Sequence, residues 1–200
     1  MKTYSLQLAD NQLITYRDRK RHLWLLSMIY PLLALSGVGL YLATGSQWLL
    51  LTPLVSIYGG ASLFDWLLGT DKSNPPEELV PQLEEDPYYR WLPMLTVPLH
   101  VVVLVVIAGF TATHELSWLS ILVLALTAGL YSGLAINTAH ELGHKKTELE
   151  RRLARIAAGI SLYGHFCIEH NRGHHRHVAT PEDPARSRMG EDIYRFALRE

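Results

Sequence analysis

The sequence contains a single cysteine, Cys167, so no disulfide can form within the chain, and a reducing compartment suits it. It also lacks an excess of either charge: 18 Lys and Arg stand against 19 Asp and Glu, for a formal net charge of −1. Nucleic-acid binding is therefore not expected. A secretory signal peptide is not expected either, because the chain opens with a polar stretch and no small-residue cleavage pattern follows the first apolar run.

Charged residues are nearly missing from four long stretches, although apolar residues make up only 48% of the whole chain. A helix of about 20 apolar residues is long enough to cross a bilayer. The sequence therefore predicts an all-α fold, a polytopic bundle of transmembrane helices. A fifth apolar stretch, 153–168, is too short and too polar to span, and we expect it to pack against the bundle. The predicted spans are 23–43, 48–69, 91–110 and 118–137.

Basic residues gather at one end of these predicted spans. "RDRKR" precedes the first span, Lys72 and Arg90 flank the loop 70–90, and "KK" and "RR" follow the fourth, whereas 44–47 and 111–117 contain no Lys or Arg. The positive-inside rule predicts three regions: a cytoplasmic N-terminal segment 1–22, a membrane region 23–137 and a cytoplasmic region 138–200. The loop 70–90, with adjacent prolines and several acids, is either a solvated connector or a lid or docking segment.

Histidines are concentrated after the fourth predicted span. His140 and His144 in "HELGHKK" are four residues apart, so they share a face of a helix. His170 and His174 in "EHNRGHH" repeat this spacing, and His175 points about 100° away from His174. Two such pairs and an offset fifth imidazole suit two metal ions better than one. Imidazole ligands suit iron, copper and zinc, and a site with no cysteines at a membrane boundary points to non-haem iron.

The histidine pattern allows two other interpretations. "HELGH" fits the H-E-x-x-H pattern of zinc metalloproteases, in which Glu141 is the general base. That site needs about three protein ligands and an open position, so the second histidine block exceeds its needs. A purely structural or surface role suits isolated residues such as His22 and His114 but not five residues at paired spacings.

The two histidine motifs, followed by "VATPEDPA", resemble the first two histidine boxes of the integral-membrane alkane 1-monooxygenases. "NPPEELVPQLE" and "LTVPLH" extend the resemblance through the spans. Membrane fatty-acid desaturases and related hydroxylases are the alternative, but their second box has a shorter gap between its histidines. The resemblance implies a non-haem di-iron enzyme of the bacterial inner membrane that hydroxylates the terminal methyl of medium-chain n-alkanes with O₂. It also implies electrons from rubredoxin, reduced by an NAD(P)H-dependent reductase.

Carried over by motif, the resemblance makes five histidines metal ligands. A third histidine box, a further histidine and a later pair of spans, which the family carries, are expected beyond residue 200. We therefore expect an N-terminal portion of the enzyme with an incomplete ligand set, not active alone. The five ligands are His140, His144, His170, His174 and His175.

Further residues are weaker expectations. A charge at Asp65 should face the site rather than lipid. Leu54, Tyr58 and Ala61 share its face at about 100° per residue, and this face either lines a substrate channel or packs against a neighbouring helix. His100, mid-span, is either a hydrogen-bonded structural residue or part of that path. The residues expected to hold the metal ligands in place are Asp65, Glu141, Glu169 and His165, while Asp183 and Asp192 are further carboxylates nearby. The arginines expected to dock acidic rubredoxin are Arg172, Arg176, Arg186 and Arg188.

Overall fold

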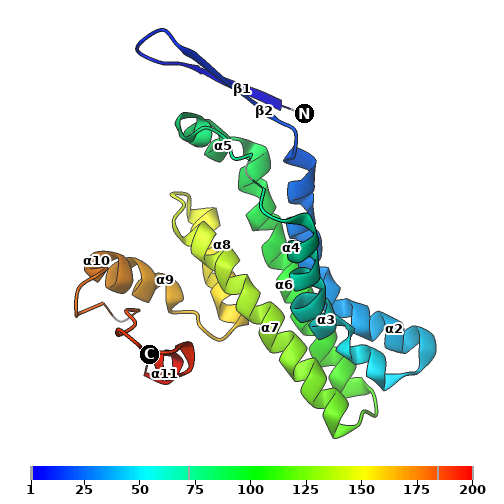
Figure 1. Cartoon of the computed structure of the whole chain (residues 1–200). Helices are drawn as coiled ribbons and strands as arrows, with labels where there is room; N and C mark the ends of the chain where they lie inside the picture. Colours follow the sequence, from blue (N-terminus) through cyan, green and yellow to red (C-terminus); the bar gives the residue numbers. More distant parts are fainter. Residues whose placement is uncertain (1, 72, 184, 200) are drawn as a thin grey trace.

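Four long helical segments dominate the computed structural model, which describes residues 2–71, 73–183 and 185–199 (Figure 1). All four are long and apolar enough to cross a membrane, in agreement with the predicted spans to within a few residues at most ends. Lys72, one of the basic residues used to predict the topology, lies outside the described residues. The four segments are Arg21–Thr44, Gln47–Leu68, Pro87–Thr113 and Trp118–Gly143.

The first two segments change helix type along their length, whereas α6 and α7 are continuous. The first comprises η1 (Arg21–Leu25), α1 (Leu26–Ile29), η2 (Tyr30–Leu35) and α2 (Ser36–Thr44). The second comprises η3 (Gln47–Leu51), α3 (Thr52–Val55), the π-helical η4 (Ser56–Ala61) and α4 (Ser62–Leu68). The third and fourth segments are α6 (Pro87–Thr113) and α7 (Trp118–Gly143).

The first two segments touch closely at Gly37. A Cβ atom built there would lie 2.9 Å from the backbone oxygen of Leu50, so only glycine allows this approach. At the same end of the bundle, the Gln47 side chain accepts hydrogen bonds from Ser117 N at 3.0 Å and from the Ser120 hydroxyl at 2.6 Å. The two short loops therefore meet, as expected for connections on one side of a membrane.

The N-terminal segment forms an antiparallel hairpin of β1 (Lys2–Gln7) and β2 (Leu13–Asp18), which the sequence analysis did not predict. The hairpin lies beyond one end of the bundle (Figure 1). Asp86, the N-cap of α6, holds it there. Its buried carboxylate accepts hydrogen bonds from Arg21 at 2.7 and 3.0 Å, from Lys2 at 2.9 Å and from the Tyr4 hydroxyl at 2.5 Å. The loop 70–90 is thus more than a solvated connector, because its last residues anchor the N-terminal hairpin.

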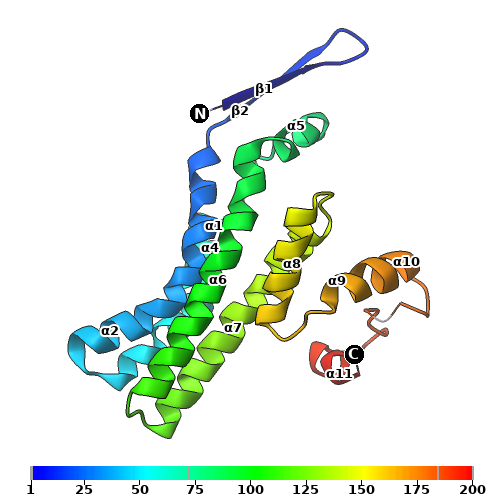
Figure 2. The ribbon, with the colours of Figure 1, turned by 180° about the vertical axis from the view of Figure 1, so that it is seen from behind.

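Beyond the fourth segment, α8 (Glu148–Ile160) folds back along α7, as Figures 1 and 2 show. Thr147 and Glu150 form a capping box at its start. Its alanine face is buried, so the predicted packing of this apolar stretch is confirmed, with a helix that begins earlier and ends at Ile160. The remaining elements are η5 (Glu77–Leu79), α5 (Val80–Glu84), α9 (Phe166–Ile168), η6 (Glu169–His174), α10 (His175–His177) and α11 (Ile193–Arg199).

The predicted channel stripe needs a correction. Leu54, Tyr58, Ala61 and Asp65 were aligned by assuming a regular α-helix, but η4 is π-helical and its turns are wider. Leu54 is half-buried, while Tyr58, Ala61 and Asp65 are exposed on the surface of the bundle. Equal spacing therefore does not establish a common face here, and the channel stays a prediction.

Candidate metal centre

The end of α7 presents the first pair of imidazoles. The helix continues to Gly143 with His144 as its C-cap, so His140 and His144 lie one turn apart on one face, as predicted. Their Nε2 atoms are 3.3 Å apart. Both side chains are exposed and therefore accessible for ligation.

The second histidine block lies in a single helical stretch with a π-helical turn at η6. In such a turn residues i and i+5 come together, rather than i and i+4. His170 accordingly meets His175, with their Nε2 atoms 3.0 Å apart. The ring of His174, the predicted partner of His170, is stacked on the His170 ring at 5.5 Å between centroids, so both histidines lie beside His170.

The two pairs converge into one cluster. The ring centroids of His140 and His170 are 4.5 Å apart, and those of His144 and His175 are 4.9 Å apart. One ligand nitrogen from each of these four residues can be chosen so that all lie within 4.8 Å of one another. Imidazole nitrogens bind a metal at about 2.1 Å, so two on opposite sides of one ion are about 4.2 Å apart. The four residues therefore fit around a single ion with little movement.

His174 stands beside this cluster and is held by Asp183. The Nδ1 atom of His174 lies 2.9 and 3.0 Å from the two carboxylate oxygens of Asp183, whose side chain is only 3% exposed. A carboxylate on one ring nitrogen is the usual support of a metal-binding histidine and leaves Nε2 free for the metal. The Asp183 carboxylate also accepts a hydrogen bond from Ala185 N at 3.0 Å. Asp183 was noticed in the sequence only as one of several nearby carboxylates.

Two imidazoles of the cluster, those of His144 and His170, are shifted toward the neutral form. Burial, followed by the neighbouring charges of His140 and His175, lowers the pKa of His170 to about 4. Burial and then His140 also lower the pKa of His144. Neutral imidazole is the form that binds metals, so the arrangement keeps these ligands ready at neutral pH.

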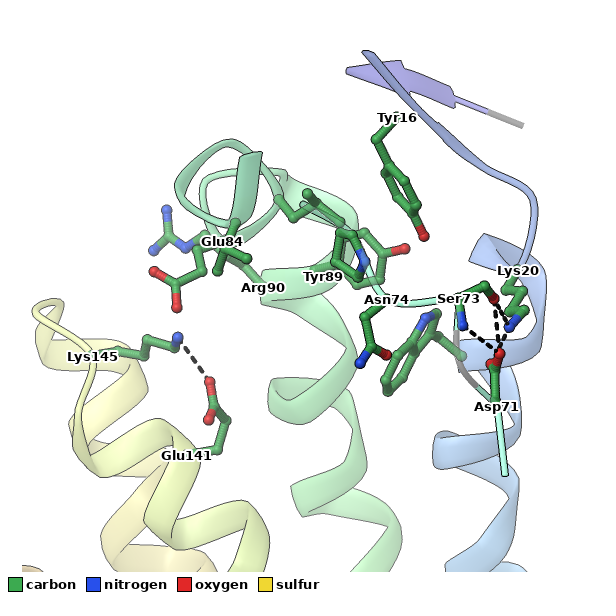
Figure 3. A pocket seen from close by; sticks show the side chains of 14 residues that line it. Tyr16, Lys20, Asp71, Ser73, Asn74, Glu84, Tyr89, Arg90, Glu141 and Lys145 are labelled. Atoms are coloured by element: carbon green, nitrogen blue, oxygen red, sulfur yellow. Dashed lines mark hydrogen bonds and ion pairs between the residues drawn. The ribbon is translucent and has the colours of Figure 1, made fainter. Parts of the chain in front are cut away.

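Glu141 faces a different part of the molecule. Its carboxylate pairs with Lys145 at 2.8 Å, and both residues line a pocket of ≈ 280 Å³ (Figure 3). The other walls come from the N-terminal segment, Asp71, residues 73–75, α5 and the start of α6, including Tyr16, Lys20 and Arg90. The predicted role of Glu141 beside the ligands stays a prediction.

The other residues expected to support the ligands vary in position. Glu169, which directly precedes His170 in the sequence, accepts a hydrogen bond from the Tyr163 hydroxyl at 2.7 Å. Its carboxylate also lies 3.5 Å from His165 Nε2. Asp65 is an exposed residue of α4. Their roles, and those of the five histidines as ligands, stay predictions. His100 is 2% exposed and shares a hydrogen bond of 3.1 Å with Tyr30, which favours a structural role.

The helices and the histidine cluster together define a helical membrane protein with a candidate metal centre at one end of its bundle. The fatty acid desaturase family model matches residues 116–200, which contain all four clustered histidines.

Curated relatives are similar to nearly the whole of this chain. Alkane 1-monooxygenase 1 of Alcanivorax borkumensis is 52% identical over 194 residues, covering 96% of this chain and 47% of the relative. Alkane 1-monooxygenases of Ectopseudomonas oleovorans and Pseudomonas putida are 51% and 49% identical, each over 92% of this chain and 46% of the relative. The chain is thus a homologue of the alkane 1-monooxygenases and spans about half the length of these relatives.

Proposed function

We propose that this chain carries the membrane anchor and part of the metal centre of a di-iron monooxygenase that converts n-alkanes to 1-alkanols with O₂. The observation that carries the proposal is the convergence of four imidazoles at the end of a membrane-crossing helix. The relatives named as alkane 1-monooxygenases support the substrate class and the position of attack at the terminal carbon.

Iron is the proposed metal. The cluster offers nitrogen ligands only, a donor set that suits iron as well as copper and zinc. Zinc has no redox chemistry with which to activate O₂. Iron is proposed over copper because the histidine motifs resemble those of the di-iron alkane monooxygenases. When bound, iron supplies the activation of O₂. His140, His144, His170 and His175 are proposed to hold one ion, and His174, oriented by Asp183, to contribute to the second. The remaining ligands of that second ion are proposed to lie outside these 200 residues.

The substrate is proposed to be a medium-chain alkane that enters from the lipid. Alkanes partition into the hydrocarbon of a membrane, and the histidine cluster lies at the end of α7. Leu54, Tyr58 and Ala61 remain the proposed channel residues, although the π-helical turn alters their alignment. Exchange of Ala61 for a bulkier residue tests whether this face limits the accepted chain length.

Rubredoxin is the proposed electron donor, reduced by an NAD(P)H-dependent reductase. The four arginines proposed to dock this acidic protein, Arg172, Arg176, Arg186 and Arg188, are all exposed. Complementary charge raises association rates and is screened by salt, so the rate at limiting rubredoxin should fall as ionic strength rises. The proposed location is the bacterial inner membrane with the histidine cluster on the cytoplasmic side, because the basic residues flank that end of the bundle.

Fatty-acid desaturation is the second candidate, favoured by the match of the desaturase family model to residues 116–200. Because both reactions use the same type of metal centre, only their products distinguish the two candidates. A desaturase forms a double bond in an acyl chain, whereas the proposed enzyme forms a primary alcohol from an alkane.

The test is product analysis together with metal analysis of the complete protein. Membranes that contain it, supplied with octane, O₂, NADH, rubredoxin and reductase, should form 1-octanol. His144→Ala should lose iron and reduce octanol formation more than about a hundredfold, since even groups that only orient ligands contribute about 10- to 100-fold. The control His22→Ala, an exposed histidine at the other end of the chain, should retain both. Full iron and full activity in His144→Ala, or an unsaturated product, would contradict the proposal.

A further inference from the structure

The outward face of α8 carries more positive charge than its one acidic partner can neutralise. Glu148 pairs with Arg151 at 3.2 Å, Arg152 at 3.0 Å and Arg155 at 3.0 Å. These three arginine side chains are 53%, 69% and 58% exposed. One carboxylate shared by three guanidinium groups leaves two positive charges in excess, free to interact with an anion.

A concave site lies next to these arginines. A pocket of ≈ 390 Å³ runs between α8 and the stretch from Gly164 to Arg172, and Arg151, Arg155 and Arg172 line it together with Glu148. Among its lining residues, three guanidinium groups face one carboxylate. The charge and the shape both suit an anionic group such as a phosphate.

Large apolar side chains surround this basic site. Leu149, Ile156, Leu162 and Ile168 are 52%, 49%, 92% and 59% exposed. Leu149 and Ile156 lie two turns apart on α8, beside the arginine face. A helix that buries one face in the protein and exposes arginines next to leucine and isoleucine is typical of segments at a membrane surface.

The position of α8 in the fold is consistent with a helix at the membrane surface. The helix starts five residues after α7 ends and runs back along it (Figures 1 and 2). Arg155 therefore lies further toward the membrane-crossing part of the bundle than Glu148 does. Arginine at this level can reach lipid phosphates, whereas the neighbouring isoleucine and leucine side chains reach acyl chains.

We propose that the arginine face of α8 and the adjoining pocket bind the headgroup phosphate of anionic phospholipid, with the flanking apolar residues inserted among its acyl chains. This fixes the helix that packs on the ligand-bearing end of α7 against the membrane surface. An acidic soluble protein fits less well, because four exposed apolar residues surround the charges.

The experiment measures lipid binding by the complete protein in neutral detergent. Phosphatidylglycerol labelled in its acyl chain is titrated by fluorescence anisotropy, and phosphatidylcholine with the same label is the reference. The wild type should bind phosphatidylglycerol more tightly. The triple variant Arg151→Gln, Arg152→Gln, Arg155→Gln should lose on the order of a hundredfold in this affinity, at about fivefold per basic residue, and leave phosphatidylcholine binding unchanged.

Matched variants make the outcome specific. Arg176→Gln, Arg186→Gln, Arg188→Gln removes three exposed arginines outside α8 and should keep the wild-type affinity. If the α8 triple variant does not fold, Arg155→Gln alone should still show a loss of about fivefold. Ile156→Asn should weaken the binding of both lipids to the same extent, since it removes a contact with the acyl chain and not with the headgroup. Equal affinity of the wild type for the two lipids, or an unchanged affinity in the α8 variants, would overturn the proposal. Displacement of the lipid by equimolar inorganic phosphate would overturn it in favour of a free-phosphate site.

Discussion

Asp183 determines which nitrogen of His174 is available to a metal. Its two oxygens lie 2.9 and 3.0 Å from Nδ1, so Nε2 is left for ligation. Asp183→Asn keeps the shape of the side chain but removes its charge and disturbs this orientation. We expect iron affinity to fall by about 10- to 100-fold, as for other partners of metal-binding histidines. Competition with a chelator measures the effect, and Asp192→Asn, an exposed aspartate near the same end of the chain, is the control that should bind iron as the wild type does.

At the scale of single residues, Asp86 provides a second test. The Arg21 guanidinium beside it holds the pKa of its carboxyl well below the usual range. Asp86→Asn retains an N-cap for α6, because asparagine caps as well as aspartate does. It should nevertheless weaken hairpin docking by about 1.5–3 kcal/mol, the contribution of hydrogen bonds to a charged group. Faster hydrogen exchange in β1 and β2 reports this loss, and Glu85→Gln should leave the exchange unchanged.

The same residue predicts a pH dependence of hairpin docking. Because the pKa of Asp86 is lowered in the folded protein, its contribution is fully present above the unfolded value of about 3.9. It is lost as the pH falls from there toward the folded value. Protection factors for hydrogen exchange in the wild-type hairpin, which correct for the pH dependence of intrinsic exchange, should therefore fall below about pH 4, whereas those of Asp86→Asn should not change over that range. Identical pH profiles in both proteins would show that another group controls the docking.

At the scale of elements, the first two membrane segments depend on Gly37. A Cβ at this position would lie 2.9 Å from Leu50 O and 3.0 Å from Pro53 Cδ, so Gly37→Ala must push the helices apart. Overpacking of this kind costs about 1–3 kcal/mol. Gly39→Ala is the matched control, because nothing lies within 4 Å of the Cβ it would add. Thermal unfolding in detergent should show a lower midpoint for Gly37→Ala alone, and equal midpoints would contradict this helix contact.

Some of these elements could be predicted from the sequence and others could not. The spans were predictable because a charge-free run of sufficient length has few alternatives, and the His140–His144 pair because α7 is regular there. The His170–His175 pair was not predictable, because the sequence does not reveal the π-helical turn and an α-helical spacing would pair His170 with His174 instead. The hairpin was missed because its anchor, Asp86, is 65 residues from Arg21 and 82 from Tyr4, and only folding brings them together.

At the scale of the whole molecule, the N-terminal hairpin and the end of α7 lie at one end of the bundle, opposite the two short loops (Figures 1 and 2). The end of α7 carries His140 and His144. The chain spans about half the length of its curated relatives. The four clustered imidazoles are enough for one ion, whereas a second ion requires His174 and ligands beyond those described. The sequence predicted five ligands as a set, but only the structure divides them into a cluster of four and a neighbour held by Asp183.

The central claim is that histidines from α7 and from the η6–α10 stretch hold the same iron ion. Iron K-edge X-ray absorption on the complete, iron-loaded protein tests it most directly. The spectrum should show a first shell dominated by imidazole nitrogen without sulfur. His144→Ala and His175→Ala, one change on each side of the cluster, should each remove imidazole scattering from the iron spectrum or abolish iron binding. A wild-type shell without imidazole, or an unchanged spectrum and iron content in either variant, would contradict the claim.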